Sequence, residues 1–204
     1  MPFLFMISEK EAELIGMHAG DGTLYKTGRV SLVWELRGSV EEKEYYEHVS
    51  RLLEGLFSVK FIPKFRSPNA WGIQTCNKEV TSFFVNRGFK PGTKTYTVRI
   101  PNYIKNASNK VKCAFIRGLF DTDGCLRFEK NRTPVYYYPR IEFGFASKFL
   151  TKDLYEMLIS LGFRVYKWNE RNCFRIGLAG RYNLNKWMKE IAPNNPKHFK
   201  KVKN

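Results

Sequence analysis

The sequence lacks the features of an exported or membrane-spanning protein. Its 204 residues contain no apolar stretch near the ~20 residues that a membrane-spanning helix needs. The apolar start at residues 1–6 is too short for the core of a signal peptide, and a charged segment follows from Ser8. We therefore expect an intracellular protein, located in the cytoplasm or nucleoid, or in an organelle if the host is eukaryotic.

Cysteine and histidine are also scarce. The chain has four cysteines, none of them in a Cys-x-x-Cys pair, and its three histidines are far from every cysteine in sequence. This spacing does not predict a structural zinc site, and a disulfide framework is not expected without an export signal. We expect reduced thiols that mostly pack in the interior.

Acidic residues are few relative to basic ones. The chain has 35 Lys and Arg against 19 Asp and Glu, a formal net charge of +16. Its hydrophobic content of 43% is too high for a disordered basic tail, so a folded protein with a strong positive field is expected. Nucleic acid is the favoured partner, because neutralising phosphates releases counterions. A membrane surface is less favoured, because the basic residues fall mostly in segments expected to be strands.

A nine-residue segment occurs twice in the chain. Residues 14–22 read Leu-Ile-Gly-Met-His-Ala-Gly-Asp-Gly, and residues 116–124 read Ile-Arg-Gly-Leu-Phe-Asp-Thr-Asp-Gly, an offset of 102 positions. Period-two alternation of apolar residues predicts strands after each copy, and apolar residues at helical spacing predict helices. The predicted elements are strands at 29–37, 58–65 and 70–76 with helices at 46–56 and 80–84, then strands at 140–145, 163–168 and 172–178 with helices at 150–161 and 184–191.

The repeat predicts an α+β fold with two halves, each in the order α-β-β-α-β-β-α. We place the first half at 1–86 and the second at 108–192. Between them, Pro-Gly and Pro-Asn pairs mark a connector at 87–107. The basic C-terminal tail, 193–204, is expected to be frayed or linker-like.

The two motif copies and their spacing resemble the single-chain LAGLIDADG homing endonucleases. The resemblance covers residues 9–191. It implies two pseudo-twofold-related halves, with the motif helices packed at their interface and two antiparallel sheets forming a DNA-binding saddle. The copies differ at the sixth motif position, which is Ala19 in the first and Asp121 in the second, and Arg117 is a further departure at the second position.

Small side chains recur on one face of each motif helix. The residues concerned are Ala12, Gly16, Ala19 and Gly20 in the first copy and Ala114, Gly118 and Thr122 in the second. Such faces let two helix backbones approach closely, which would explain interior glycines that each cost ~1 kcal/mol relative to alanine. Gly22 and Gly124 are expected to take the left-handed conformation that ends many helices.

The motif acids, Asp21 and Asp123, stand at the C-terminal ends of the two helices. The helix dipole is negative there and favours cations, and close helix packing would also bring the two carboxylates together. A shared divalent cation resolves both unfavourable terms, and hard oxygen ligands suit Mg²⁺. The alternative interpretation is that each aspartate is only a turn residue. The resemblance adds the main-chain carbonyls of Gly20 and Thr122 as metal ligands.

The chemistry that the resemblance implies is hydrolysis of DNA phosphodiesters by a monomer at a long asymmetric target. Each acid would serve one strand, and the product would be a double-strand break with short 3′ overhangs. We expect Mg²⁺ or Mn²⁺ to support cleavage and Ca²⁺ to bind without supporting it. Arg37 and Lys148, each just past the end of a core strand, are candidates to stabilise the charged transition state, or else are solvated strand-end charges.

The polar faces of the two sheets are expected to read DNA, because a twisted antiparallel ribbon fits the major groove. Arg, Gln, Asn and Glu can pair with base edges, whereas many Lys contact only phosphates. The candidates are Tyr25, Arg29, Ser31, Lys60, Lys64, Arg66 and Gln74 in the first half, and Arg127, Glu129, Asn131, Tyr138, Arg140, Glu142, Arg164, Tyr166, Trp168 and Arg175 in the second.

Intron homing is the biological role that the resemblance favours. A start at Met1 and an end in Val-Lys-Asn favour a free-standing enzyme over one carried in a splicing domain. Two other functions remain open at this stage. One is an RNA-binding maturase whose partner is its own intron RNA. The other is a DNA-binding regulator that does not cut, which the presence of both motif acids makes less favourable.

Overall fold

The computed structural model describes residues 7–28, 31–130 and 137–199. The predicted order of elements is confirmed in both halves. The first half contains α1 (Glu9–Ala19), β1 (Thr23–Thr27), β2 (Ser31–Ser39), α2 (Lys43–Phe57), β3 (Lys64–Ser67), β4 (Ala70–Thr75) and α3 (Lys78–Asn86). The second contains α5 (Asn109–Asp123), β5 (Gly124–Lys130), β6 (Tyr137–Phe145), α6 (Lys148–Ser160), β7 (Val165–Glu170), β8 (Cys173–Ala179) and α7 (Gly180–Glu190).

One strand is shorter than expected. The strand predicted at 58–65 begins only at Lys64. Ser58 ends α2 in the left-handed conformation, with φ of 54°, and turns the chain out of the helix. Pro63 then lies directly before the strand and has no N–H to donate to a ladder, so pairing cannot start earlier at that position.

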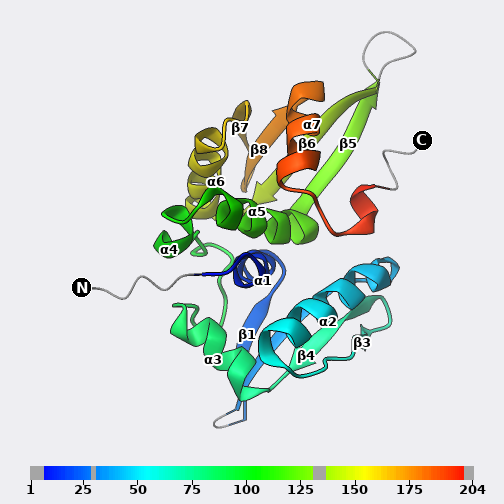
Figure 1. The fold of residues 1–204 in the computed structure, drawn as a ribbon, viewed down its shortest axis with the longest axis vertical. Helices are drawn as coiled ribbons and strands as arrows, with labels where there is room; N and C mark the ends of the chain where they lie inside the picture. The colour runs from blue at the N-terminus through cyan, green and yellow to red at the C-terminus, as the bar shows by residue number, and fades with distance from the viewer. Residues whose placement is uncertain (1–6, 29–30, 131–136, 200–204) are drawn as a thin grey trace.

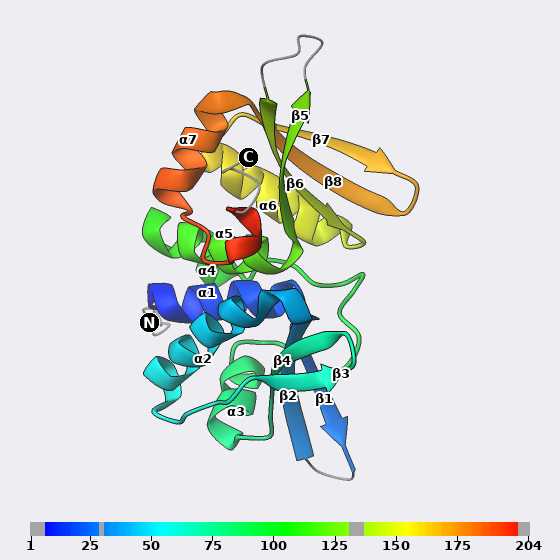
Figure 2. The ribbon, with the colours of Figure 1, turned by 90° about the vertical axis from the view of Figure 1, so that its right-hand side faces the viewer.

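Each half forms a four-stranded antiparallel sheet, in the order β1-β2-β4-β3 or β5-β6-β8-β7. Thr23 pairs with Glu35 in the first sheet, and Cys125 pairs with Glu142 at the equivalent place in the second. Helices α2 and α3 cover one face of the first sheet, and α6 and α7 cover one face of the second. Figure 2 shows α2 and α7 on one side of the molecule and the strands on the other. The opposite face of each sheet carries polar side chains.

Helices α1 and α5 lie side by side at the centre and join the two halves (Figures 1 and 2). The predicted close approach is confirmed: a Cβ added to Gly16 would lie 2.1 Å from the Phe115 carbonyl oxygen. A Cβ added to Gly118 would lie 2.0 Å from the Glu13 carbonyl oxygen. Neither position can therefore carry any side chain while the helices stay this close.

The glycines that end the two motifs do not adopt the left-handed conformation, so that prediction was wrong. Gly124 is extended, with φ of −85°, and Gly22 is not among the glycines with positive φ. Glycine is required there for space instead. A Cβ on Gly22 would lie 2.5 Å from His18 Cα, and one on Gly124 would lie 1.9 Å from a ring carbon of Phe120.

The connector contacts both halves, through the Gly92 amide and the Leu24 carbonyl in the first and through Asp153 in the second. It contains the short helix α4 (Asn102–Lys105). The carboxylate of Asp153 on α6 accepts hydrogen bonds from the Ile100 amide at 3.1 Å and from the side chains of Arg99 and Lys105, each at 3.3 Å. These bonds hold the segment between the halves in one position.

Two further expectations concern membranes and thiols. Among the described residues, no helix combines the length and apolar character needed to cross a bilayer.

The four cysteines are free thiols, but Cys113 alone is buried and Cys76 is exposed. The expectation that they mostly pack in the interior was therefore wrong, because Cys125 and Cys173 lie half-buried on strands of the second sheet.

Candidate catalytic site between the motif helices

The two motif acids meet where α1 and α5 end. Asp123 is the last residue of α5, and Asp21 follows the end of α1 at Gly20. Their carboxyl groups are hydrogen-bonded to each other. A Cβ on Gly20 would lie 2.1 Å from Thr122 Oγ1 and 3.1 Å from an oxygen of Asp123, so glycine is needed to let the two chains approach.

The electrostatics of this pair are those of two crowded carboxylates. Burial and the charge of Asp21 together raise the pKa of Asp123 to about 7, against the opposing effect of Lys94 and Lys197. Loss of water around the carboxyl group also raises the pKa of Asp21, against the opposing charge of Lys197. The surroundings thus disfavour the charged forms of both acids, and a cation that bound between them would favour those forms.

Two lysines that the sequence analysis missed lie at the ends of the same helices. The Lys94 ammonium donates to the Ala19 carbonyl at 3.1 Å and to the Gly20 carbonyl. The Lys197 ammonium donates to the Thr122 carbonyl at 3.1 Å. Each lysine thus neutralises the negative end of a helix dipole and binds free carbonyls. Their only signal in sequence is spacing: Lys94 follows Asp21 by 73 residues, and Lys197 follows Asp123 by 74.

The donor set fits a hard divalent cation. Two carboxylates and the carbonyls of Gly20 and Thr122 are oxygen ligands of the kind that Mg²⁺ prefers. In this structure both carbonyls accept hydrogen bonds from lysine ammonium groups. The described residues contain no cluster of three or more His, Cys, Asp or Glu side chains. Water or a DNA phosphate would therefore have to complete the coordination.

The segment that follows α7 returns to this site, which contradicts the expectation of a frayed tail. We call residues 193–199 the C-terminal arm; residues 200–204 lie outside the described part of the chain. The amides of Asn194 and Asn195 donate to the two oxygens of Asp121, at 2.9 and 3.1 Å. Asp121 is fully buried, and burial raises its pKa to about 7 although these two hydrogen bonds lower it. A buried acid that binds main-chain amides explains why the arm stays ordered.

The arm also crosses to the first half. Lys197 forms an ion pair with Glu42 at 2.9 Å. Burial raises the pKa of Glu42, but the charge of Lys197 and its hydrogen bonds lower it below the usual value. Asn194 donates to Glu13 at 2.8 Å, and Glu13 also binds Arg117 of α5 at 3.1 Å. A charged network therefore links both motif helices and the arm.

The two basic residues proposed from sequence lie elsewhere. Arg37 is exposed on β2, two residues beyond Glu35, which pairs with Thr23 close to Asp21. Lys148 is the first residue of α6, and its ammonium lies 5.3 Å from the centre of the Phe149 ring. The groups that donate to the motif carbonyls are Lys94 and Lys197, and a catalytic role for Arg37 and Lys148 remains a prediction.

Four polar side chains form a chain of hydrogen bonds across the first sheet. Arg66 binds Glu35 at 3.2 Å and also donates to Gln74, which donates to the Tyr25 hydroxyl. Glu35 was not among the predicted contacts, although its place in the polar register of β2 could have indicated it. The other candidates divide as follows: Ser31 and Lys64 are exposed on strands, Lys60 lies in the loop before β3, and Arg29 is outside the described residues.

The second sheet carries a denser set of charged pairs. Arg127 binds Glu142 at 2.8 Å, Arg140 binds Glu129 and the Tyr166 hydroxyl, and Arg175 pairs with Glu170 at 2.6 Å. Trp168 stacks on Tyr166, and Tyr138 lies beneath the guanidinium of Arg140. A hollow of about 810 Å³ joins this surface to Asp123 and is lined by Arg127, Glu142, Trp168 and Arg175 among others. The acid and the polar face are thus continuous.

One of the predicted contacts in this half, Arg164, is not on that face. The guanidinium of Arg164 lies 4.5 Å from the ring centre of Tyr182 on α7, a helix on the covered side of the sheet. Its position just before β7 places it outside the strand alternation that the prediction assumed. Asn131 lies outside the described residues.

Sequence comparison finds relatives for most of the chain. The family model of the LAGLIDADG-like domain matches residues 110–192. The uncharacterized protein MJ1054 of Methanocaldococcus jannaschii is 29% identical over 167 residues, which are 79% of this chain and 18% of that protein. The chain spans about a fifth or less of the length of the curated relatives that it matches, between 12% and 22%.

Structural comparison covers both halves. I-DmoI, a homing endonuclease, in complex with DNA and Ca is similar with a TM-score of 0.65 and 18% identity, over 96% of this chain and 98% of that one. The homing endonuclease I-WcaI bound to its DNA recognition sequence is similar with a TM-score of 0.64 and 15% identity, over 95% and 85% of the two chains. Residues 110–192 thus match the model of the LAGLIDADG-like domain, and the chain as a whole has the fold of these homing endonucleases.

Proposed function

We propose that this protein is a site-specific double-strand DNA endonuclease that depends on a divalent metal. The observation that carries the proposal is the hydrogen-bonded pair of Asp21 and Asp123, held between two helix ends and flanked by Lys94 and Lys197. Two carboxylates in this position are electrostatically unfavourable for a protein that only binds. They become favourable when a cation joins them at a DNA phosphate.

In this proposal, recognition and chemistry are carried out by different residues. The polar faces of both sheets bind the duplex and place its two strands over the helix ends. Asp21 and Asp123 would hold the metal, with the carbonyls of Gly20 and Thr122 as further ligands. When bound, Mg²⁺ or Mn²⁺ supplies Lewis acidity at the scissile phosphates and stabilises the leaving 3′ oxygens. Lys94 and Lys197 add positive charge beside the phosphates as negative charge develops.

The similar structures support this assignment because they are complexes with DNA, some of them with a divalent metal. I-DmoI is described in complex with DNA and Mn and with DNA and Ca, and I-WcaI with its DNA recognition sequence. In this chain the two polar faces differ, because Glu35 binds an arginine from β3 whereas Glu142 binds one from β5. We therefore propose a long asymmetric target, bound by one copy of the chain and cut with Mg²⁺ or Mn²⁺ but not with Ca²⁺.

The test is cleavage of a library of random duplexes with Mg²⁺, followed by sequencing of the broken ends. We expect one target with a double-strand break, and no cutting in EDTA. Asp21→Asn and Asp123→Asn should each abolish double-strand cutting while leaving affinity for the recovered target largely unchanged, since the sheet faces remain.

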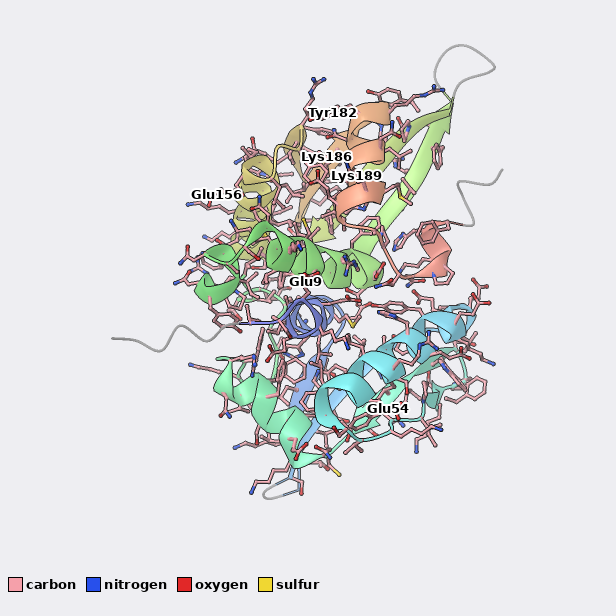
Figure 3. The ribbon with its side chains drawn as sticks, in the orientation of Figure 1. Glu9, Glu54, Glu156, Tyr182, Lys186 and Lys189 are labelled. Atoms are coloured by element: carbon pink, nitrogen blue, oxygen red, sulfur yellow. The ribbon has the colours of Figure 1, made fainter. Side chains whose placement is uncertain are left out.

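The control is Glu156→Gln, which removes the same charge from the outer side of α6 (Figure 3), where the side chain pairs only loosely with Lys152 at 3.8 Å. This variant should cut like the wild type. Full cutting by either aspartate variant would contradict the proposal. Tight sequence-specific binding by a wild type that never cuts would instead indicate a DNA-binding regulator.

A further inference from the structure

The two lysines at the site are held by different means. In the first half, the Gly92 amide donates to the Leu24 carbonyl at 2.8 Å, two residues before Lys94. In the second half, the equivalent segment is the C-terminal arm, and its anchor is the side chain of Asp121. Ala19, the counterpart of Asp121 in the first motif, has no side-chain acceptor. The pseudo-twofold symmetry of the fold is therefore broken at this point.

Asp121 binds the arm through both side-chain oxygens and through its main-chain carbonyl. Both of its oxygens accept main-chain amides from consecutive residues, and its own carbonyl accepts the Asn195 side-chain amide at 2.8 Å. Asp121 and Asn195 are both fully buried. Asn195 also accepts the Lys197 amide at 3.1 Å, so the anchor reaches the lysine itself within one turn of chain. A carboxylate that accepts charge-assisted bonds from two main-chain amides holds them more firmly than a neutral acceptor would.

The arm also contacts the first half. Asn194 donates to Glu13 at 2.8 Å, Asn195 donates to Glu42 at 2.7 Å, and Lys197 pairs with Glu42 at 2.9 Å, while the His198 ring stacks on Phe120 of the second half. These contacts limit how the arm lies across the interface. The bonds to Asp121 set its height above the end of α5, where the Thr122 carbonyl accepts the Lys197 ammonium.

We propose that Asp121 is a positioning residue that fixes the C-terminal arm, and with it Lys197, so that one of the two DNA strands is cut under its control while the other is not. This inference rests on the proposed function. Asp121 itself does not touch DNA or metal in this proposal. Its loss would displace Lys197 and leave Lys94 in place, so the affected enzyme would nick the strand served by the first half and cut the second strand slowly.

The experiment uses the target recovered from the duplex library, labelled separately on each strand. Asp121→Asn keeps the size of the side chain, but its NH₂ group opposes one of the two main-chain amides. We expect the nicked duplex to accumulate, with cutting of one strand about 10- to 100-fold slower and the other unchanged, as small displacements at reacting groups produce. Lys197→Met should slow the same strand without touching the buried anchor, and Lys94→Met should slow the opposite strand.

The matched control is Lys189→Met on the outer side of α7 (Figure 3), an exposed lysine that should leave both strands at wild-type rates. A second readout does not need cleavage. Hydrogen exchange in the peptide spanning 193–199 should accelerate in Asp121→Asn, whereas peptides from α1 and α5 should be unchanged. Binding of the labelled duplex should also be unchanged.

Three results would overturn the inference. Equal slowing of both strands in Asp121→Asn would show a general structural role, and wild-type cutting of both strands by Lys197→Met would show that the lysine is not needed. Unchanged exchange in the arm would show that Asp121 does not hold it. A wild type that cuts no duplex would overturn the proposed function and the strand effect together, whereas the exchange measurement would still decide whether Asp121 holds the arm.

Discussion

At the scale of single residues, the site contains two acids, Asp21 and Asp123, whose surroundings destabilise the charged carboxylate. The pKa of Asp123 is raised to about 7, and that of Asp21 is raised as well. A carboxyl group with a raised pKa costs stability once the pH exceeds its unfolded value near ~4, and the cost is complete above the folded value. The metal-free protein should therefore lose stability from these groups as the pH rises from about 4 to about 7.

Removing one charge should reverse this loss. We expect Asp123→Asn to melt at the same or a higher temperature than the wild type in EDTA, by ~1 kcal/mol at pH 7 and less at pH 5. Added Mg²⁺ should then stabilise the wild type more than the variant, because only the wild type keeps both ligands. Thermal melts at both pH values check this, with Glu156→Gln as the reference. A clearly less stable Asp123→Asn in EDTA would mean that the carboxylate is a structural acceptor.

At the scale of elements, backbone contact between α1 and α5 determines where the acids lie. The glycines at this contact cannot be replaced without moving a helix, since an added Cβ would approach a main-chain oxygen to 2.1 Å at Gly16 and 2.0 Å at Gly118. Overpacking of this kind costs ~1–3 kcal/mol or more. It would also separate Asp21 from Asp123.

Two glycine-to-alanine changes should therefore have opposite effects. Gly118→Ala should destabilise the protein by at least ~2 kcal/mol and reduce cleavage, because the two helices must separate. Gly55→Ala, within α2, meets only the end of the Lys10 side chain at 3.3 Å and should stabilise the protein by ~0.5–1 kcal/mol through higher helix propensity. Denaturant unfolding of both variants is the measurement. A neutral Gly118→Ala would show that the interface can relax.

Local patterns predicted these elements well, because alternation and helical spacing report which face of each element is buried. Ile141 and Phe143 alternate with polar residues in sequence and are buried on β6 as expected. What the patterns could not predict depends on contacts between distant segments. From sequence alone, Lys94 and Lys197 resemble ordinary exposed lysines in loops. They reach the acids only because the connector and the C-terminal arm each fold back onto the end of a motif helix.

At the scale of the whole molecule, the proposed recognition of DNA depends on which side of each sheet an arginine occupies. Arg175 lines the hollow that contains Asp123, whereas Arg164 packs on Tyr182 of α7. Arg175→Ala should cost ~1–3 kcal/mol at one base position and relax specificity there, if its guanidinium reads a guanine. Arg164→Ala should leave base preference unchanged. Binding to a set of single-base variants of the target measures both, and a uniform loss for Arg175→Ala would identify a phosphate contact instead.

The C-terminal arm has a consequence for how independently the two halves can unfold. It is anchored on Asp121 of α5 in the second half, and it also binds Glu13 and Glu42 of the first half. Detachment of the arm would therefore remove contacts from both halves at once, so the arm makes the unfolding of one half more dependent on the other.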